Sequence, residues 1–129
     1  MPNWQPKWED VAWDHAAAEA LSAELNRKAD LLESSITRRA HVANYAAAEW
    51  QGPKRLLFDA YRETVMTRAQ ALANQYREMA ERIGKASGDA RSEQNHRESE
   101  RRRWHDEAAD EEREERQRDQ RRRNERQPV

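Results

Sequence analysis

Apolar residues recur every three or four positions along the first fifty residues of the chain. Such spacing gathers side chains on one face of an α-helix, and a stripe rich in alanine favours close packing of that helix against another. The pattern predicts a helix over residues 10–50, whose stripe comprises Ala18, Leu21, Leu25, Ala29, Leu32, Ile36, Ala40, Ala43, Ala47 and Trp50.

A second stripe with the same spacing follows residue 53. It comprises Leu57, Tyr61, Val65, Ala69, Leu72, Tyr76, Met79 and Ile83, with Phe58 beside it. Gly84 and Gly88 predict the end of this second helix, because glycine readily adopts the conformation that closes a helix.

Residues 49–53 are the only short interruption between the two stripes. Trp50 ends the first stripe, Gly52 can adopt the positive φ that terminates a helix, and Pro53 suits the first turn of the next helix. We therefore expect a turn at residues 50–53 and an antiparallel helical hairpin over residues 10–88.

The larger side chains of both stripes predict the seam of the hairpin or of a dimer. These are Leu21, Leu25, Leu32, Ile36, Leu57, Phe58, Tyr61, Val65, Leu72, Tyr76, Met79 and Ile83. One hairpin covers only part of each stripe, so a second hairpin is expected to complete a four-helix bundle.

Composition agrees with an all-α fold of limited core. The chain of 129 residues is 38% charged and 36% hydrophobic, with three glycines and four prolines. Its mean hydropathy of -1.39 is too low for a compact globule. Long helices that pack on one another are the fold that such a composition favours.

The N-terminal arm, residues 1–9, contains Pro2, Trp4, Pro6 and Trp8, a composition that disfavours regular helix. Two interpretations are open. The arm is either loose, or its tryptophans, together with Trp13, pack on a neighbouring helix, because exposed tryptophans forgo a favourable burial.

Residues 89–129 form a charged C-terminal extension with 12 arginines, no lysine and 13 acidic residues. No core can form there, and the segment is expected to be partly helical or disordered. Acid-before-base pairs at i, i+4 favour a solvated helix over residues 92–126: Glu98 with Arg102, Glu112 with Arg116, Glu114 with Arg118, and Asp119 with Arg123.

Candidate catalytic and metal-binding chemistry is sparse. Cysteine is absent, and neither a phosphate-binding glycine loop nor a nucleophile elbow occurs. The four histidines are scattered over different segments, and a metal site needs three or four converging ligands. We expect no enzymatic activity, no cofactor, no metal and no small-molecule substrate.

The arrangement of Trp50 and Gly52 between two helices resembles the WXG family, the small early-secreted-antigen-like proteins exported by type VII (ESX) secretion systems of actinobacteria and their relatives. The resemblance covers residues 10–90. Phe58, eight residues after the tryptophan, and the late positions Met79, Ala80, Ile83 and Ala86 are similar to the family pattern.

One departure from the family concerns the export signal, a Tyr-x-x-x-Asp/Glu motif just after the second helix. Ala90 and Gln94 occupy those places here, and Tyr45 with Glu49 fits the motif only on the first helix. The resemblance thus implies a heterodimer with a related WXG-type hairpin that carries the export signal. Trp50 and Gly52 would complete a recognition surface for the secretion ATPase. The alternative for Trp50 is a structural role, in which the large ring closes the open end of the hairpin.

The resemblance also implies synthesis in the cytoplasm and secretion by a route that needs no signal peptide. The N-terminal residues do not show the pattern of a signal peptide. A different class of function is a cytosolic coiled-coil adaptor that binds a larger protein or nucleic acid through the charged extension. The net charge of -1 and the acidic residues that interrupt the arginine clusters make nucleic acid the weaker partner. Membrane binding through the amphipathic helices is compatible with the pattern, but the balanced charge does not indicate it.

Overall fold

Two α-helices make up the fold. The computed structural model describes residues 1–127 and contains no β-strand among them. Helix α1 spans His15–Ala46 and helix α2 spans Pro53–Arg126, and the two pack against each other as a helical hairpin. The predicted all-α class is confirmed. The chain divides into two compact units, residues 14–87 and residues 1–13 with 88 onward, which are described separately.

Helix α1 is shorter at both ends than the predicted span of residues 10–50. Asp14 caps its N-terminus, because the Asp14 side chain accepts a hydrogen bond from the backbone N–H of Ala17 at 3.0 Å. Ala47 is the C-terminal cap, and residues 47–52 connect it to α2. Gly52 has a φ of 104°, the only positive φ among the described residues.

Helix α2 continues through both glycines that were expected to end it. The predicted end at Gly84 or Gly88 is wrong, because neither glycine has a positive φ and the helix runs on to Arg126. A glycine inside a helix costs only about 1 kcal/mol. The strong helix formers and acid–base pairs that follow are sufficient to offset that cost.

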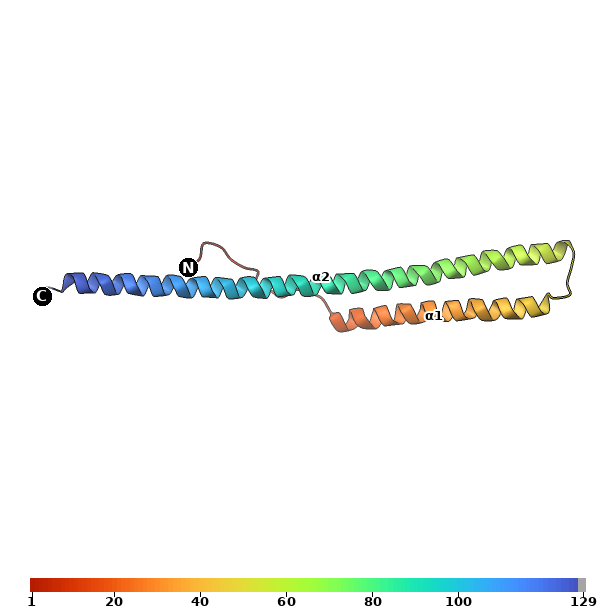
Figure 1. Ribbon diagram of the computed structural model, residues 1–129, viewed down its shortest axis with the longest axis horizontal. Helices are drawn as coiled ribbons and strands as arrows, with labels where there is room; N and C mark the ends of the chain where they lie inside the picture. Colours follow the sequence, from red (N-terminus) through yellow and green to blue (C-terminus); the bar gives the residue numbers. More distant parts are fainter. Residues whose placement is uncertain (128–129) are drawn as a thin grey trace. The chain divides into compact units, whose positions relative to one another are not determined.

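Within the unit of residues 14–87, α1 and α2 lie side by side (Figure 1). Small side chains line their contact. Ala29 and Ala73 are completely covered, at 0% exposure. No large side chain is fully buried, so the helices meet over a narrow strip. The buried apolar residues of this strip are Ala18, Leu25, Ala29, Ala47, Ala73 and Ala80.

The larger residues predicted for the seam divide into two groups. Leu25 is buried, and the half-buried members are Leu32, Ile36, Phe58, Val65, Tyr76 and Ile83. The exposed members are Leu21, Leu57, Tyr61, Leu72 and Met79. These five residues are not covered by the contact between α1 and α2, and their place in a dimer seam stays a prediction.

The second unit consists of residues 1–13 and the helix from Gly88 onward. Its N-terminal segment forms no helix and lies along α2 (Figure 1). Pro2 and Pro6 are buried and Trp4 is half-buried. Of the two interpretations of residues 1–9, packing on a helix is therefore the one that the structure adopts, but of the three tryptophans named for it, Trp8 and Trp13 remain exposed. Over residues 1–127, neither helix has a stretch long and apolar enough to cross a membrane.

Candidate interaction surfaces

One flank of the hairpin is closed by polar contacts between α1 and α2. Arg77 donates hydrogen bonds to Asp30 at 2.6 Å and to Glu33 at 2.9 and 3.1 Å. These two carboxylates raise the pKa of Arg77 above its ordinary value, the hydrogen bond to Asp30 contributing most. Arg62 also reaches Asn44 across the helices, at 2.8 Å. We call this side the closed flank.

The opposite flank is apolar and open. With about 100° of rotation per residue, Asp30 and Glu33 lie on one side of the buried line through Leu25, whereas Leu21 lies on the other side. On α2, Arg77 lies on one side of the line through Ala73 and Ala80. The side chains of Leu57, Tyr61, Leu72 and Met79 lie on the other side, within about 60° of one another.

Arg77 on α2 pairs with Asp30 and Glu33 on α1, so the sides of the two helices that carry these residues form the same flank. The apolar sides of α1 and α2 therefore face the opposite flank together. We define the open flank as Leu21, Leu57, Tyr61, Leu72 and Met79. Tyr61 is 71% exposed and Met79 is 47% exposed. The half-buried predicted residues such as Val65 and Tyr76 lie between the open flank and the seam.

The connection between the helices is held by one arginine from the first turns of α2. The Arg55 guanidinium donates to the carbonyl of Ala47 and, at 3.0 Å, to that of Trp50, while Asp59 fixes its other edge at 3.0 and 3.1 Å. Carbonyl groups at the C-terminus of a helix lack partners within it. The last turn of α1 contains no basic residue, so Arg55 satisfies this end from the other helix.

Trp50 lies in this connection and packs against Phe58. Their ring centroids are 5.4 Å apart with planes inclined by 43°. Trp50 remains 41% exposed, so part of the indole is accessible. The predicted recognition residues Trp50 and Gly52 thus occupy the connection, next to the Arg55 contacts.

The arm, together with Asp10 and Val11, is bound through both its backbone and its side chains. Trp104 donates through Nε1 to the carbonyl of Trp4 at 2.9 Å. Arg101 donates to the carbonyls of Lys7 and Glu9 at 2.9 and 2.8 Å, and Arg97 also donates to the Glu9 carbonyl at 2.9 Å. These contacts are not predicted from the sequence, although the partners on α2 recur at helical spacing.

Gln94 continues the same row of contacts on α2. Its side chain accepts from the backbone N–H of Val11 at 2.8 Å and donates to Asp10 at 2.9 Å. The hydrogen bond from Gln94 is the main reason that the pKa of Asp10 lies below its ordinary value of 3.8, and the hydrogen bond and charge of Arg101 add to it. Arg101 reaches Asp10 at 2.9 Å.

Aromatic rings anchor the arm at its N-terminal half. The rings of Trp8 and Trp104 meet edge to face at 5.3 Å, and His105 lies 5.6 Å from Trp8. Trp4 donates through Nε1 to Glu107 at 2.7 Å, and the Arg103 guanidinium lies 4.4 Å above its ring. Such ring contacts contribute about 0.5 to 1.5 kcal/mol each beyond the area they bury.

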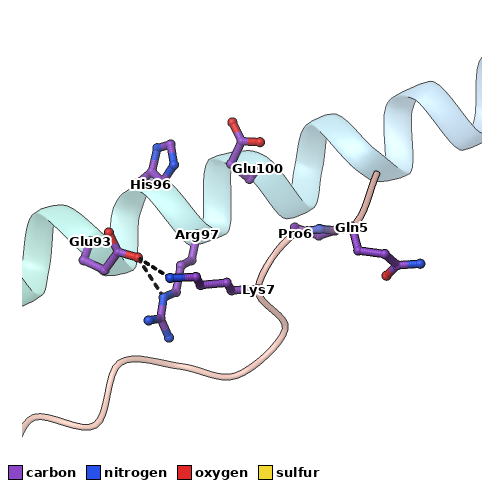
Figure 2. A pocket seen from close by; sticks show the side chains of 7 residues that line it. All are labelled: Gln5, Pro6, Lys7, Glu93, His96, Arg97 and Glu100. Carbon is purple, nitrogen blue, oxygen red and sulfur yellow. Dashed lines mark hydrogen bonds and ion pairs between the residues drawn. The ribbon is translucent and has the colours of Figure 1, made fainter. Parts of the chain in front are cut away.

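A shallow pocket lies between the arm and α2 within this unit (Figure 2). Lys7 and Arg97 both contact Glu93, at 3.9 and 3.0 Å. The hydrogen bond from Arg97 is the largest reason that the pKa of Glu93 lies below its ordinary value of 4.5, with smaller effects of Lys7, Arg97 and His96. The cationic groups of the pocket, Lys7 and Arg97, are already paired with Glu93, so the pocket shows no preference for an anion. The lining residues are Gln5, Pro6, Lys7, Glu93, His96, Arg97 and Glu100.

Beyond the arm, α2 is a solvated helix whose acid–base pairs form only in part. Arg116 contacts Glu112 at 2.6 Å and Arg118 contacts Glu114 at 3.7 Å, as the spacing predicts. The expected pairs of Glu98 with Arg102 and of Asp119 with Arg123 do not form within residues 1–127; Glu98 instead accepts from Gln94 at 3.1 Å.

No group of three or more His, Asp or Glu side chains in the described part of the chain is arranged to hold a metal ion. The chain matches no protein-family model, and neither a curated protein nor a solved structure is significantly similar to it. The resemblance to the WXG family therefore stays a prediction from the sequence.

Proposed function

We propose that this chain is a protein–protein interaction component whose hairpin pairs with a second helical hairpin through the open flank. The observation that carries the proposal is the contrast between the two flanks. Polar contacts of Arg77 and Arg62 close one side, whereas the other side exposes Leu57, Tyr61 and Leu72. Apolar rows of this length on a thin hairpin are stabilised when another helix pair covers them.

The partner that we propose is a related hairpin, giving a four-helix bundle. Two antiparallel hairpins place four apolar stripes around one core, which is the arrangement that this pattern favours. A WXG-type turn at Trp50 and Gly52 would then stand at one end of the bundle, with part of the indole accessible.

Within this interaction class, we propose a heterodimer that leaves the cell through a type VII system. The support is the Trp-x-Gly sequence at the connection, the contact of Trp50 with Phe58, and the absence of a tyrosine export motif after the hairpin. The partner would supply that motif, and the secretion ATPase would recognise the dimer.

Substitution on the open flank tests the pairing. Leu72→Glu should reduce pairing of the full chain with its partner hairpin in sedimentation velocity, because a carboxylate would have to be buried against the partner. The matched control is Thr67→Glu, which places the same charge on an exposed position of α2 away from both flanks. Equal effects of the two variants, or a monomeric unmodified chain that also fails to bind its partner, would contradict the pairing.

The heterodimer needs a separate experiment, which is co-expression with the product of the adjacent reading frame. We expect a 1:1 complex by native mass spectrometry and export of this chain only when the partner is present. Trp50→Ala should abolish export with little change in the melting temperature of the complex. Export of this chain alone would contradict the heterodimer, although pairing through the open flank could still hold.

A second function, in a different class, is a cytosolic adaptor that binds through the charged extension. The observation in its favour is the triplet Arg121, Arg122 and Arg123, which is exposed and has no ion-pair partner within residues 1–127. These charges also suit the C-terminal end of a helix dipole. Replacing all three by glutamine should abolish capture of an acidic protein or RNA if the adaptor function holds, and should leave type VII export unchanged.

A further inference from the structure

The face of α2 that holds the arm has the properties of a peptide-binding surface. Its contacts with the arm proceed in order and antiparallel to the helix: Trp104 bonds Trp4, Arg101 bonds Lys7, and Gln94 bonds Val11. All three are hydrogen bonds to main-chain atoms of the arm. Main-chain contacts of this kind depend on an extended segment and not on the covalent connection of that segment to the same molecule.

Two features make the face selective for the sequence of the arm. The rings of Trp4 and Trp8 are received by Arg103 and Trp104, and Glu107 accepts from the Trp4 indole. Charged side chains of the arm also meet opposite charges on α2, because Lys7 contacts Glu93 and Asp10 contacts Arg101. The ligand that these contacts favour is an extended segment with two tryptophans, a cationic side chain and an anionic one.

We propose that the arm-binding face of α2, residues 93–111, is an interaction surface for the arm of a second copy of this chain, so that two copies exchange arms. A second copy carries the one segment that the observed contacts already fit in sequence, charge and direction. Residues 12–14, which follow the last contact with the face at Val11, form no helix and join the arm to α1. Exchange of an identical element between protomers needs no new contact.

The arm of the same chain competes for the face with the arm of a second copy, and this competition sets the apparent affinity for the second arm. A tethered segment experiences an effective concentration in the millimolar range. If the arm is docked in at least about nine-tenths of the molecules, the apparent affinity for a free arm falls at least about tenfold. Removal of the tryptophan anchors in cis should restore the intrinsic affinity.

A fluorescent peptide with the sequence of residues 1–13 tests the face directly. We expect the full chain with Trp4→Ala and Trp8→Ala to bind the peptide at least about tenfold more tightly than the unmodified chain, by fluorescence anisotropy. Adding Arg101→Ala and Trp104→Ala should abolish binding, while circular dichroism reports whether each variant keeps its helix. Equal binding to the anchored and the anchorless chain, or binding to neither, would overturn the proposal.

Exchange between copies is tested with cysteine labels, which are specific because the chain has no cysteine. One copy carries Asn3→Cys with a donor dye and the face substitutions Arg101→Ala and Trp104→Ala. The other carries Arg102→Cys with an acceptor dye and the anchor substitutions Trp4→Ala and Trp8→Ala. Energy transfer in the mixture is expected, and it should vanish when the anchors are removed from both copies.

Transfer that persists without any anchors would arise from hairpin pairing alone and would refute arm exchange. Absence of transfer in the original mixture would also refute it. The peptide experiment does not depend on pairing through the open flank, because the peptide lacks the hairpin. The failure of one proposal therefore leaves the other intact.

Discussion

Different interactions cover the helix in the hairpin and in the arm-bearing part of α2. In the hairpin, alanines such as Ala29 and Ala73 meet in a strip from which water is excluded, and few hydrogen bonds cross it. In the arm unit, the side chains of Arg97, Arg101 and Trp104 satisfy backbone carbonyls. Helix packing needs periodic sequence on both sides, whereas an extended segment needs only side chains on the helix that can form hydrogen bonds with it.

The difference predicts that the two units respond to different perturbations. Removal of buried carbon should weaken the hairpin most, and changes in charge should weaken the arm most. Each prediction below can contradict this division, beginning with the largest expected effect.

Truncation of the buried leucine should give the largest loss of stability. Leu25 is 7% exposed, so Leu25→Ala should reduce the free energy of unfolding by about 2 kcal/mol or more. Leu31→Ala, the same change at a residue that is 55% exposed, should stay within about 0.5 kcal/mol. Urea unfolding followed by circular dichroism at fixed protein concentration measures both, and similar losses would mean that the hairpin seam is not where the structure has it.

Alanine substitutions at two glycines should act in opposite directions. Gly52→Ala should destabilise the hairpin by about 1 kcal/mol or more, because residue 52 has a φ of 104°. Gly84→Ala should stabilise by about 0.5 to 1 kcal/mol, because the glycine is inside α2 and an added Cβ would meet nothing within 4 Å. Thermal unfolding reports both signs, and a destabilising Gly84→Ala would indicate that the helix ends there after all.

Acidification should release the arm, because carboxylates help to hold it, whereas the ring contact of Trp50 with Phe58 involves no titratable group. Asp10 and Glu93 have pKa values below 3.8 and 4.5, so their contribution to docking is complete above those values and is lost as the pH falls through the lowered values of the folded protein. The indole N–H resonance of Trp104 should shift in this range while that of Trp50 stays in place. Simultaneous shifts of both would show that the two units do not respond separately.

The two helices could be predicted because their stabilisation is periodic. Every residue that the structure buries in the hairpin strip, apart from Ala73 and Ala80, belongs to the stripe of α1 identified from spacing alone. Large residues such as Tyr61 and Met79, which the same spacing places on that face, are exposed in a single hairpin, and their place in a dimer seam stays a prediction. Periodicity identifies an apolar face but not which molecule covers it.

The position of the arm could not be predicted, because many of its contacts with α2 use backbone atoms of the arm. A carbonyl of Lys7 or Glu9 has no sequence signature, and the arginines that bind it look like the other arginines of the extension. One signal was present on the helix: Gln94, Arg97, Arg101 and Trp104 recur at spacings of three and four. Side chains that can donate hydrogen bonds, aligned on one face, mark a place where a helix can hold an extended chain.

The alanine strip has a consequence for the register of the hairpin. Small side chains interlock weakly, so a slide of α1 along α2 by one helical turn, about 5.4 Å, would change the packing little. Such a slide would separate Arg77 from both of its carboxylates and Ser22 from the carbonyl of Ala80. The polar residues of the closed flank thus fix the register of the two helices among several alignments of nearly equal packing. The alanines provide the attraction between the helices.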